Sequence, residues 1–150
     1  MKASTEVQIR LCGASDVAAL ADLAGQLGYP STSSQIAARL SVLLESADHA
    51  ILVATAAGST QPIGFAHVIV RRLLVDDVTV ELAALVIDER HRGRGCGKSL
   101  LKAAEQWALD RGIDSLSLRS NVIRTAAHSF YESLGYDRVK TSYAFRKALS

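Results

Sequence analysis

Three stretches in the first half of the chain have the alternating or β-branched patterns that are typical of strands: residues 7–11, 50–56 and 63–70. Gly58 and Ser59 separate the last two and favour an antiparallel hairpin. Between the first two strands, apolar residues three and four positions apart predict two helices. The first helix places Val17, Leu20, Ala21, Ala24 and Leu27 on its buried face and ends at Gly28, and the second places Ile36, Leu40, Leu43 and Leu44.

In the second half, residues 78–87 are almost wholly apolar, which predicts a central strand covered on both faces, with residues 71–77 as a loop before it. A glycine-rich turn and a helix follow, and the helix has Leu100, Leu101, Ala104, Trp107 and Ala108 on its buried face and ends near Gly112. Leu116 and Leu118 predict a short strand that runs parallel to the central one. A helix over residues 126–134 ends at Gly135, and the alternating tail 136–149 predicts one bent strand or two. No repeat or linker interrupts this order, so we expect one domain, 1–150, of the α/β class.

The composition allows one soluble core. The chain has 150 residues, of which 49% are hydrophobic, and a formal net charge of only +2, so no global field favours nucleic acid or an anionic membrane as a partner. Residues 1–6 lack the apolar segment of an export signal, and no apolar run reaches the roughly 18 residues of a membrane span, so we expect a cytoplasmic protein. Cys12 and Cys96 are too few for a disulfide framework or a zinc cage, and we expect both to be buried.

The glycine-rich turn is the clearest candidate site. Gly93, Gly95 and Gly97 leave the backbone N–H groups unshielded just before a helix N-terminus, which is an anion-binding arrangement. Positive charge and a hydroxyl donor come from Arg92, Arg94, Lys98 and Ser99. A Walker phosphate loop would need glycine at position 92, and a dinucleotide fingerprint would need glycine at position 98 or 100, so both alternatives fail on spacing.

The remaining pattern, Arg92-x-x-Gly95-x-Gly97 between an apolar strand and a helix, resembles the coenzyme A motif of the GCN5-related N-acetyltransferase (GNAT) family. A second motif of that family resembles Asn121, Ala126, Ala127, Phe130, Tyr131, Leu134, Gly135 and Tyr136. The resemblance implies an acetyl-coenzyme A-dependent N-acetyltransferase. It also implies an α/β (α+β) fold with a central, mixed, mostly antiparallel sheet of six to seven strands and four helices, splayed between the fourth and fifth strands.

The resemblance also implies which residues bind the cofactor. Backbone groups of Leu85, Val86 and Ile87 would pair with the pantetheine arm, and Asn121 would bind it or order a water, unless Asn121 only forms a turn. The pyrophosphate would be held by the amides of Arg92, Gly93, Arg94, Gly95, Cys96, Gly97, Lys98 and Ser99. The Cys96 side chain has no evident activating partner, which favours packing beneath the turn over a nucleophilic role.

The transfer chemistry requires a proton acceptor, because an amine of pKa about 10.4 is protonated at pH 7 and freeing its lone pair costs about 4.6 kcal/mol. Glu81, near the start of the central strand, is the candidate base, directly or through water, and an ion pair with a neighbouring arginine is the alternative. By resemblance, Tyr131 is the candidate general acid, and a packed core tyrosine is the alternative. The oxyanion donor would be the N–H of Val86 or a neighbour, at a bulge in the strand.

The sequence alone does not assign a role to the four histidines or identify the acceptor. His49, His67, His91 and His128 show no metal-ligand spacing, so no metal site is expected, although His67 could be a second base or a substrate contact. By resemblance, residues 28–34 and 71–77 select the acceptor, a primary amine; carboxylates there are few, and Arg71 and Arg72 suit an acceptor with an anionic group. The chain resembles small-molecule aminoalkyl acetyltransferases, including those acting on aminoalkylphosphonates, and a homodimer is expected on the same ground. Peptide or protein amines, an acyl-coenzyme A sensor without activity, and a phosphoryl-transfer enzyme are the alternatives.

Overall fold

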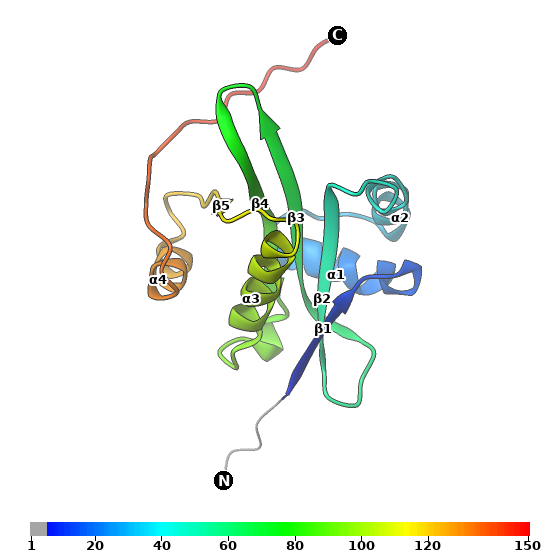
Figure 1. The fold of residues 1–150 in the computed structure, drawn as a ribbon. Helices are drawn as coiled ribbons and strands as arrows, with labels where there is room; N and C mark the ends of the chain where they lie inside the picture. Colours follow the sequence, from blue (N-terminus) through cyan, green and yellow to red (C-terminus); the bar gives the residue numbers. More distant parts are fainter. Residues whose placement is uncertain (1–5) are drawn as a thin grey trace. The chain divides into compact units, whose positions relative to one another are not determined.

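The computed structural model describes residues 6–150, which form four α-helices, five strands and two short 3-10 turns (Figure 1). The chain falls into two compact units: the first ends at Leu118, and the second comprises Arg119–Ser150. Residues 1–5 lie outside the described residues. They belong to the segment 1–6, whose composition is the reason we expect no export signal. Within residues 6–150, every helix is too short or too polar to cross a bilayer.

The first unit is built on one sheet with the strand order β1-β2-β3-β4-β5. Neighbouring strands are antiparallel except β4 and β5, which are parallel, as the sequence predicts for the strand, helix and strand around the glycine-rich turn. The strands are β1 (Val7–Leu11), β2 (His49–Ala56), β3 (Pro62–Leu73), β4 (Asp76–Ile87) and β5 (Leu116–Leu118). This mixed, mostly antiparallel α+β architecture confirms the expected fold class.

The described residues form four helices, and capping residues mark one end each of the first two. They are α1 (Val17–Leu27), α2 (Ser33–Leu43), α3 (Cys96–Leu109) and, in the second unit, α4 (Thr125–Ser133). α1 ends at Gly28, which has φ 104°, a conformation that favours glycine. α2 begins at Thr32, whose hydroxyl accepts the N–H of Gln35 while the Gln35 side chain accepts the N–H of Thr32. Two 3-10 turns, Ala14–Asp16 and Glu89–His91, precede α1 and follow β4.

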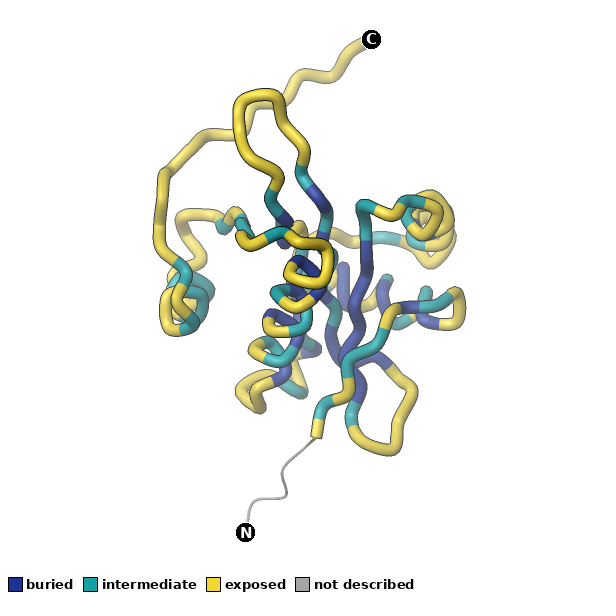
Figure 2. The backbone as a smooth tube through the Cα atoms, in the orientation of Figure 1, coloured by how far each residue is buried: buried dark blue, intermediate teal, exposed yellow. Residues whose placement is uncertain are grey.

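The sheet is covered on both faces, with α1 and α2 on one and α3 on the other. Leu20 of α1 and Leu40 of α2 pack with Ile51 and Val53 of β2 in one buried cluster. On the other face, all five residues that the sequence predicts for the buried side of α3 are buried. Figure 2 shows the buried positions running along the central strands between these helices. Cys12 and Cys96 are both buried free thiols, as expected.

The predicted loop at residues 71–77 is wrong. β3 continues to Leu73 and β4 begins at Asp76, so only Leu74 and Val75 connect them, and both side chains are exposed. The polar pair Arg71-Arg72 is typical of a loop. In the structure, however, β3 and β4 continue as a hairpin beyond the covered part of the sheet. The backbone hydrogen bonds between the two strands hold this hairpin without buried side chains.

The apolar run of β4 predicts a strand that is buried on both faces, and this prediction is wrong. Only Val80, Leu82 and Val86 are buried, and Ala83 is exposed. β5 pairs with β4 at Val80–Leu82 alone. From Ala83 onward, therefore, β4 lacks a strand neighbour on that side within the described chain. β5 itself ends at Leu118, so the splay between the fourth and fifth strands that the resemblance implies stays a prediction.

In the second unit, α4 matches the predicted helix, and Gly135 follows it with φ 91°. The predicted strand or strands over residues 136–149 are wrong: this tail forms no regular secondary structure, and its alternating apolar side chains are exposed. The described sheet therefore has five strands rather than six to seven. Alternation indicates which side chains could share a face, but a strand forms only where another strand supplies hydrogen bonds, and no such strand lies within residues 119–150.

Candidate active site

The glycine-rich turn forms the open N-terminus of α3. Gly93 and Gly95 have φ of 77° and 82°, in the left-handed region that favours glycine, and a Cβ on either would meet no atom within 4 Å. Gly95 is the N-cap, and among residues 6–150 no side chain caps the helix. Glycine is required at these two positions by backbone conformation and leaves the space in front of the helix open.

Three consecutive amides face that space. The first hydrogen bond of the helix runs from the N–H of Ser99 to the carbonyl of Gly95 at 3.0 Å, so the N–H groups of Cys96, Gly97 and Lys98 precede the helical ladder. The helix dipole adds a partial positive charge there. The side chains of Arg92, Arg94 and Lys98 are exposed around the same turn. This combination of free amides and cations is suited to an anion with several oxygens, such as a pyrophosphate.

Two side chains of the turn serve the protein itself. The Ser99 hydroxyl donates to the Gly95 carbonyl at 3.1 Å, so it closes the first turn of α3 instead of pointing at a ligand. Arg92 Nε donates to the carbonyl of Ile87 at 3.0 Å, which ties the turn to the end of β4. The Cys96 side chain is buried, and burial raises the pKa of its thiol to about 11. A neutral, packed thiol agrees with the packing interpretation of Cys96 over the nucleophilic one.

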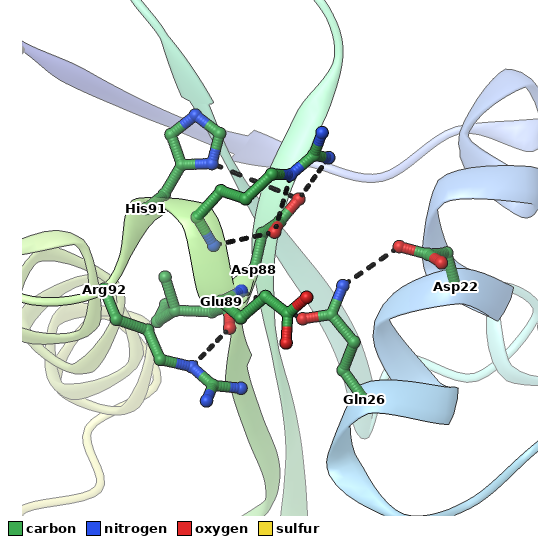
Figure 3. A network of polar contacts seen from close by, with 8 residues as sticks. Asp22, Gln26, Asp88, Glu89, His91 and Arg92 are labelled. Atoms are coloured by element: carbon green, nitrogen blue, oxygen red, sulfur yellow. Dashed lines mark hydrogen bonds and ion pairs between the residues drawn. The ribbon is translucent and has the colours of Figure 1, made fainter.

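The sequence interpretation missed Asp88, a buried carboxylate directly after β4 (Figure 3). Its Oδ1 accepts the backbone N–H of Arg90 at 3.1 Å, and Arg90 Nη2 donates to its Oδ2 at 2.9 Å. These bonds from Arg90, its side chain first, lower the pKa of Asp88 to about 2. His91 Nδ1 lies 4.0 Å from the same carboxylate. Asp88 thereby fixes the path of the chain from β4 into the glycine-rich turn.

A second connection runs from this segment to α1. Gln26 Oε1 accepts the backbone N–H of Glu89 at 2.9 Å, and Gln26 Nε2 donates to Asp22 at 3.0 Å (Figure 3). The only sequence signal for Asp88 is an acidic residue at the junction of an apolar strand and a basic turn. For Gln26 no local signal exists, because its partner lies more than sixty positions away in the chain.

β4 changes its register with β3 at Ala83. Leu82 pairs with Val68 and Ala84 pairs with His67, so Ala83 is the extra residue of a bulge. The sequence interpretation expected the bulge at Val86 or a neighbour, and the structure has it three residues earlier, at Ala83. Leu85, Val86 and Ile87 follow it, paired with β3 but without a partner on the β5 side within the described chain. This backbone edge leads from the bulge to the glycine-rich turn.

A cavity of about 440 Å³ lies on the sheet face that α1 and α2 cover. Its walls come from α1, α2 and the segment between them, and its floor comes from β2, β3 and the bulge of β4. Phe65 and His67 of β3 and Ala83 and Ala84 of β4 are among the floor residues. The bulge therefore belongs both to this cavity and to the unpaired edge of β4.

Three titratable side chains share the cavity's face of the sheet. Glu81 pairs with Ile69, which pairs with His49, and His67 lies two residues before Ile69, so strand alternation places all three on one face. His49 Nδ1 and His67 Nε2 lie 3.0 Å apart, within hydrogen-bonding distance. Burial, and to a lesser extent the neighbouring His49, lowers the pKa of His67 to about 4. His67 is therefore neutral at pH 7, and Glu81 is half-buried on the same face of the sheet.

The segments that the resemblance links to the acceptor differ in their contacts. Tyr29 and Ser31 of residues 28–34 line the cavity. Arg71 and Arg72 belong instead to the projecting β3–β4 hairpin, where Arg72 Nη2 lies 3.6 Å from Asp48. Within residues 6–150, no group of three histidine, cysteine or acidic side chains is arranged to hold a metal ion.

The second unit carries the two remaining candidates, Asn121 and Tyr131. Asn121 Oδ1 accepts the N–H of Ile123 at 3.2 Å, which is the turn-forming role that the sequence left as an alternative. Its carbonyl accepts from His128 Nε2 at 2.8 Å. Tyr131 is half-buried, edge-on to Tyr136 with the ring centroids 6.2 Å apart, and burial raises the pKa of its hydroxyl. The hydroxyl therefore stays protonated at neutral pH.

Comparisons with known proteins agree with this geometry. The sequence model of the acetyltransferase (GNAT) family matches residues 19–136. An N-acetylaspartate synthetase from Danio rerio is 38% identical over 64 residues, which are 43% of this chain and 23% of the relative. The chain spans a quarter to a third of the length of the curated relatives it matches.

Solved structures share the fold over nearly the whole chain. An aminoglycoside N-acetyltransferase, AAC(6')-Iy, in complex with CoA has a TM-score of 0.84 at 20% identity and covers 99% of each chain. Glucosamine-6-phosphate N-acetyltransferase from Arabidopsis thaliana has a TM-score of 0.79 at 20% identity, over 94% of this chain and 98% of that one. At these identities the likeness shows the fold.

Proposed function

Because this chain belongs to the acetyltransferase (GNAT) family, we propose that it moves an acetyl group from acetyl-coenzyme A to a primary amine of a small molecule. One observation carries the proposal: the open N-terminus of α3 adjoins the unpaired edge of β4, and the bulge on that edge borders a cavity large enough for a small acceptor. An anion site, a backbone edge and an acceptor cavity are thus contiguous within the first unit.

The residues present fit acetyl-coenzyme A, which supplies the acetyl thioester when bound. The amides of Cys96, Gly97 and Lys98 would donate to the pyrophosphate, each charge-assisted bond contributing about 1.5–3 kcal/mol. The helix dipole would add about 0.3–1 kcal/mol. Arg92 and Arg94 would neutralise the remaining charge. Leu85, Val86 and Ile87 would pair with the amide groups of the pantetheine arm as a further strand does.

Glu81 is the proposed base for the acceptor nitrogen, directly or through one water. It lies on the same face of the sheet as the cavity, on the strand that carries the bulge, but it is not one of the residues that line the cavity. His67, neutral and on the cavity floor, is a second proton acceptor for the same step. After the nitrogen attacks the carbonyl carbon, an N–H of the strand near the bulge would donate to the oxyanion. Tyr131, whose raised pKa keeps the hydroxyl protonated, would donate its proton to the departing thiolate.

The test is thiol release from acetyl-coenzyme A in the presence of single amines, 2-aminoethylphosphonate and a lysine-containing peptide among them. Replacement of Glu81 by glutamine should lower kcat/KM by about 10²–10⁴-fold. Glu45→Gln, at an exposed position in the turn after α2, is the matched control and should leave the rate unchanged. A chain that binds coenzyme A and releases no thiol with any amine would be the acyl-coenzyme A sensor, and a chain active only on the peptide would modify protein amines.

A further inference from the structure

The cavity beside β4 is apolar and carries a single charged side chain. Its lining is mostly aliphatic and aromatic, and Arg39 of α2 is the one charged residue among the described residues that line it. No aspartate or glutamate lines it within the described chain. A polycationic acceptor would find no counter-charge there, so the lining disfavours an aminoglycoside-like amine.

Arg39 is exposed and its guanidinium is available for an anion. Its Nη1 donates to the hydroxyl of Ser31 at 3.1 Å, and within residues 6–150 no carboxylate lies in salt-bridge distance of it. A guanidinium presents several N–H donors in a planar fork that matches a carboxylate or a phosphonate. Ser31 supplies a hydroxyl beside it, and Tyr29 is a further polar residue of the cavity lining.

The charged end and the reactive end of the cavity are separated across the sheet. Leu40, next to Arg39, packs with Ile51 and Val53 of β2, whereas the bulge residues Ala83 and Ala84 belong to β4. β2 and β4 flank β3, so they lie two strand spacings apart, about 10 Å. Between these ends the cavity is lined by Phe65 and the aliphatic residues of α1 and α2.

We propose that this cavity binds the acceptor, and that the acceptor is an amine whose anionic group is separated from the nitrogen by an extended apolar segment. The anionic group pairs with Arg39, the apolar segment lies against Phe65, and the nitrogen reaches the bulge of β4 beside His67. The assignment of the amine end rests on the proposed acetyltransferase function. The pairing with Arg39 does not.

The experiment compares three probes with the same chain length: 6-aminohexanoate, hexylamine and 1,6-diaminohexane. Each is titrated into the CoA-saturated protein by calorimetry, and each is then offered as acceptor in the thiol-release assay. We expect 6-aminohexanoate to bind about tenfold more tightly than hexylamine, since one charge-assisted pair distinguishes them, and 1,6-diaminohexane to bind most weakly. Arg39→Gln should remove the preference, Arg39→Lys should keep part of it, and Arg39→Glu should reverse it in favour of the diamine.

Arg72→Gln is the matched control, because Arg72 is an exposed arginine on the β3–β4 hairpin that the sequence offered for the anionic group. It should leave the order of the probes unchanged. Equal binding of the three probes, tighter binding of the diamine, no binding of any probe, or an order that survives Arg39→Gln would each overturn the proposal. If the probes bind in the expected order but no thiol is released, the result supports the binding site for an anionic amine. The same result contradicts only the acetyltransferase function.

Discussion

Gly95 and Gly58 offer a matched pair for testing the glycine-rich turn. Gly95 has φ 82° before α3, and Gly58 has φ 78° at the tip of the β2–β3 hairpin; a Cβ on either would meet nothing within 4 Å. Replacement by alanine therefore adds the same backbone strain, about 1–2 kcal/mol, at both positions and no clash at either. For a domain of this size we expect each variant to lose roughly 2–8 °C of Tm.

The two variants should differ in coenzyme A affinity. If the backbone at Gly95 relaxes away from the left-handed conformation, the N–H groups of Cys96 and Gly97 turn from the pyrophosphate position. The loss of one such charge-assisted bond, about 1.5–3 kcal/mol, weakens binding by about tenfold or more. Calorimetric titration with coenzyme A measures this directly. Gly58→Ala should bind as the wild type does, and equal affinities in the two variants would refute the reasoning.

Three further outcomes follow from buried contacts. Asp88→Asn should weaken coenzyme A binding by about 1 kcal/mol, near fivefold by calorimetry, because the amide holds the turn less firmly. In the folded chain the pKa of His67 is lowered from 6.5 to about 4. Between these two pH values the unfolded chain binds a proton that the folded chain does not, so wild-type stability falls as the pH drops from about 6.5 to 4. The full difference is at most about 3 kcal/mol, which the partial exposure of the ring reduces to about 1–2. Urea titrations at pH 7 and pH 4.5 should show that loss in the wild type, and His67→Gln should lose less. Gly64→Ala would put a Cβ 2.9 Å from the carbonyl of Val86 and should cost about 1–3 kcal/mol in urea unfolding, whereas Gly25→Ala, with open space on α1, should stabilise by about 1 kcal/mol.

Local patterns predicted the part of the fold around the turn. The apolar run of β4, the glycines, and the helical spacing from Leu100 to Ala108 are all signals within a few residues, and the structure confirms the strand, helix and parallel strand they predict. Non-local features could not be predicted in this way. The bulge at Ala83 depends on the register with β3, and the end of pairing at Leu82 depends on the length of β5.

The same distinction between local and non-local features applies to the candidate site. Spacing identified the glycine-rich turn, but the roles of Asp88 and Gln26 appear only when distant segments meet. The proximity of His49 and His67 likewise follows from the antiparallel register of β2 and β3. The alternating tail shows the limit of the pattern itself, because alternation predicts a face and not a partner strand. The catalytic roles of Glu81 and Tyr131, the single domain and the homodimer stay predictions.

The central claim is that the amides at the start of α3 bind the pyrophosphate of coenzyme A, and amide NMR tests it most directly. In a ¹⁵N-labelled sample, saturating coenzyme A should shift the amide proton signals of Cys96, Gly97 and Lys98 downfield, because these N–H groups form new hydrogen bonds to anionic oxygens. Pantetheine, which lacks the pyrophosphate, should leave those signals in place. If coenzyme A binds while these amides stay unchanged, or if pantetheine shifts them equally, the account is contradicted.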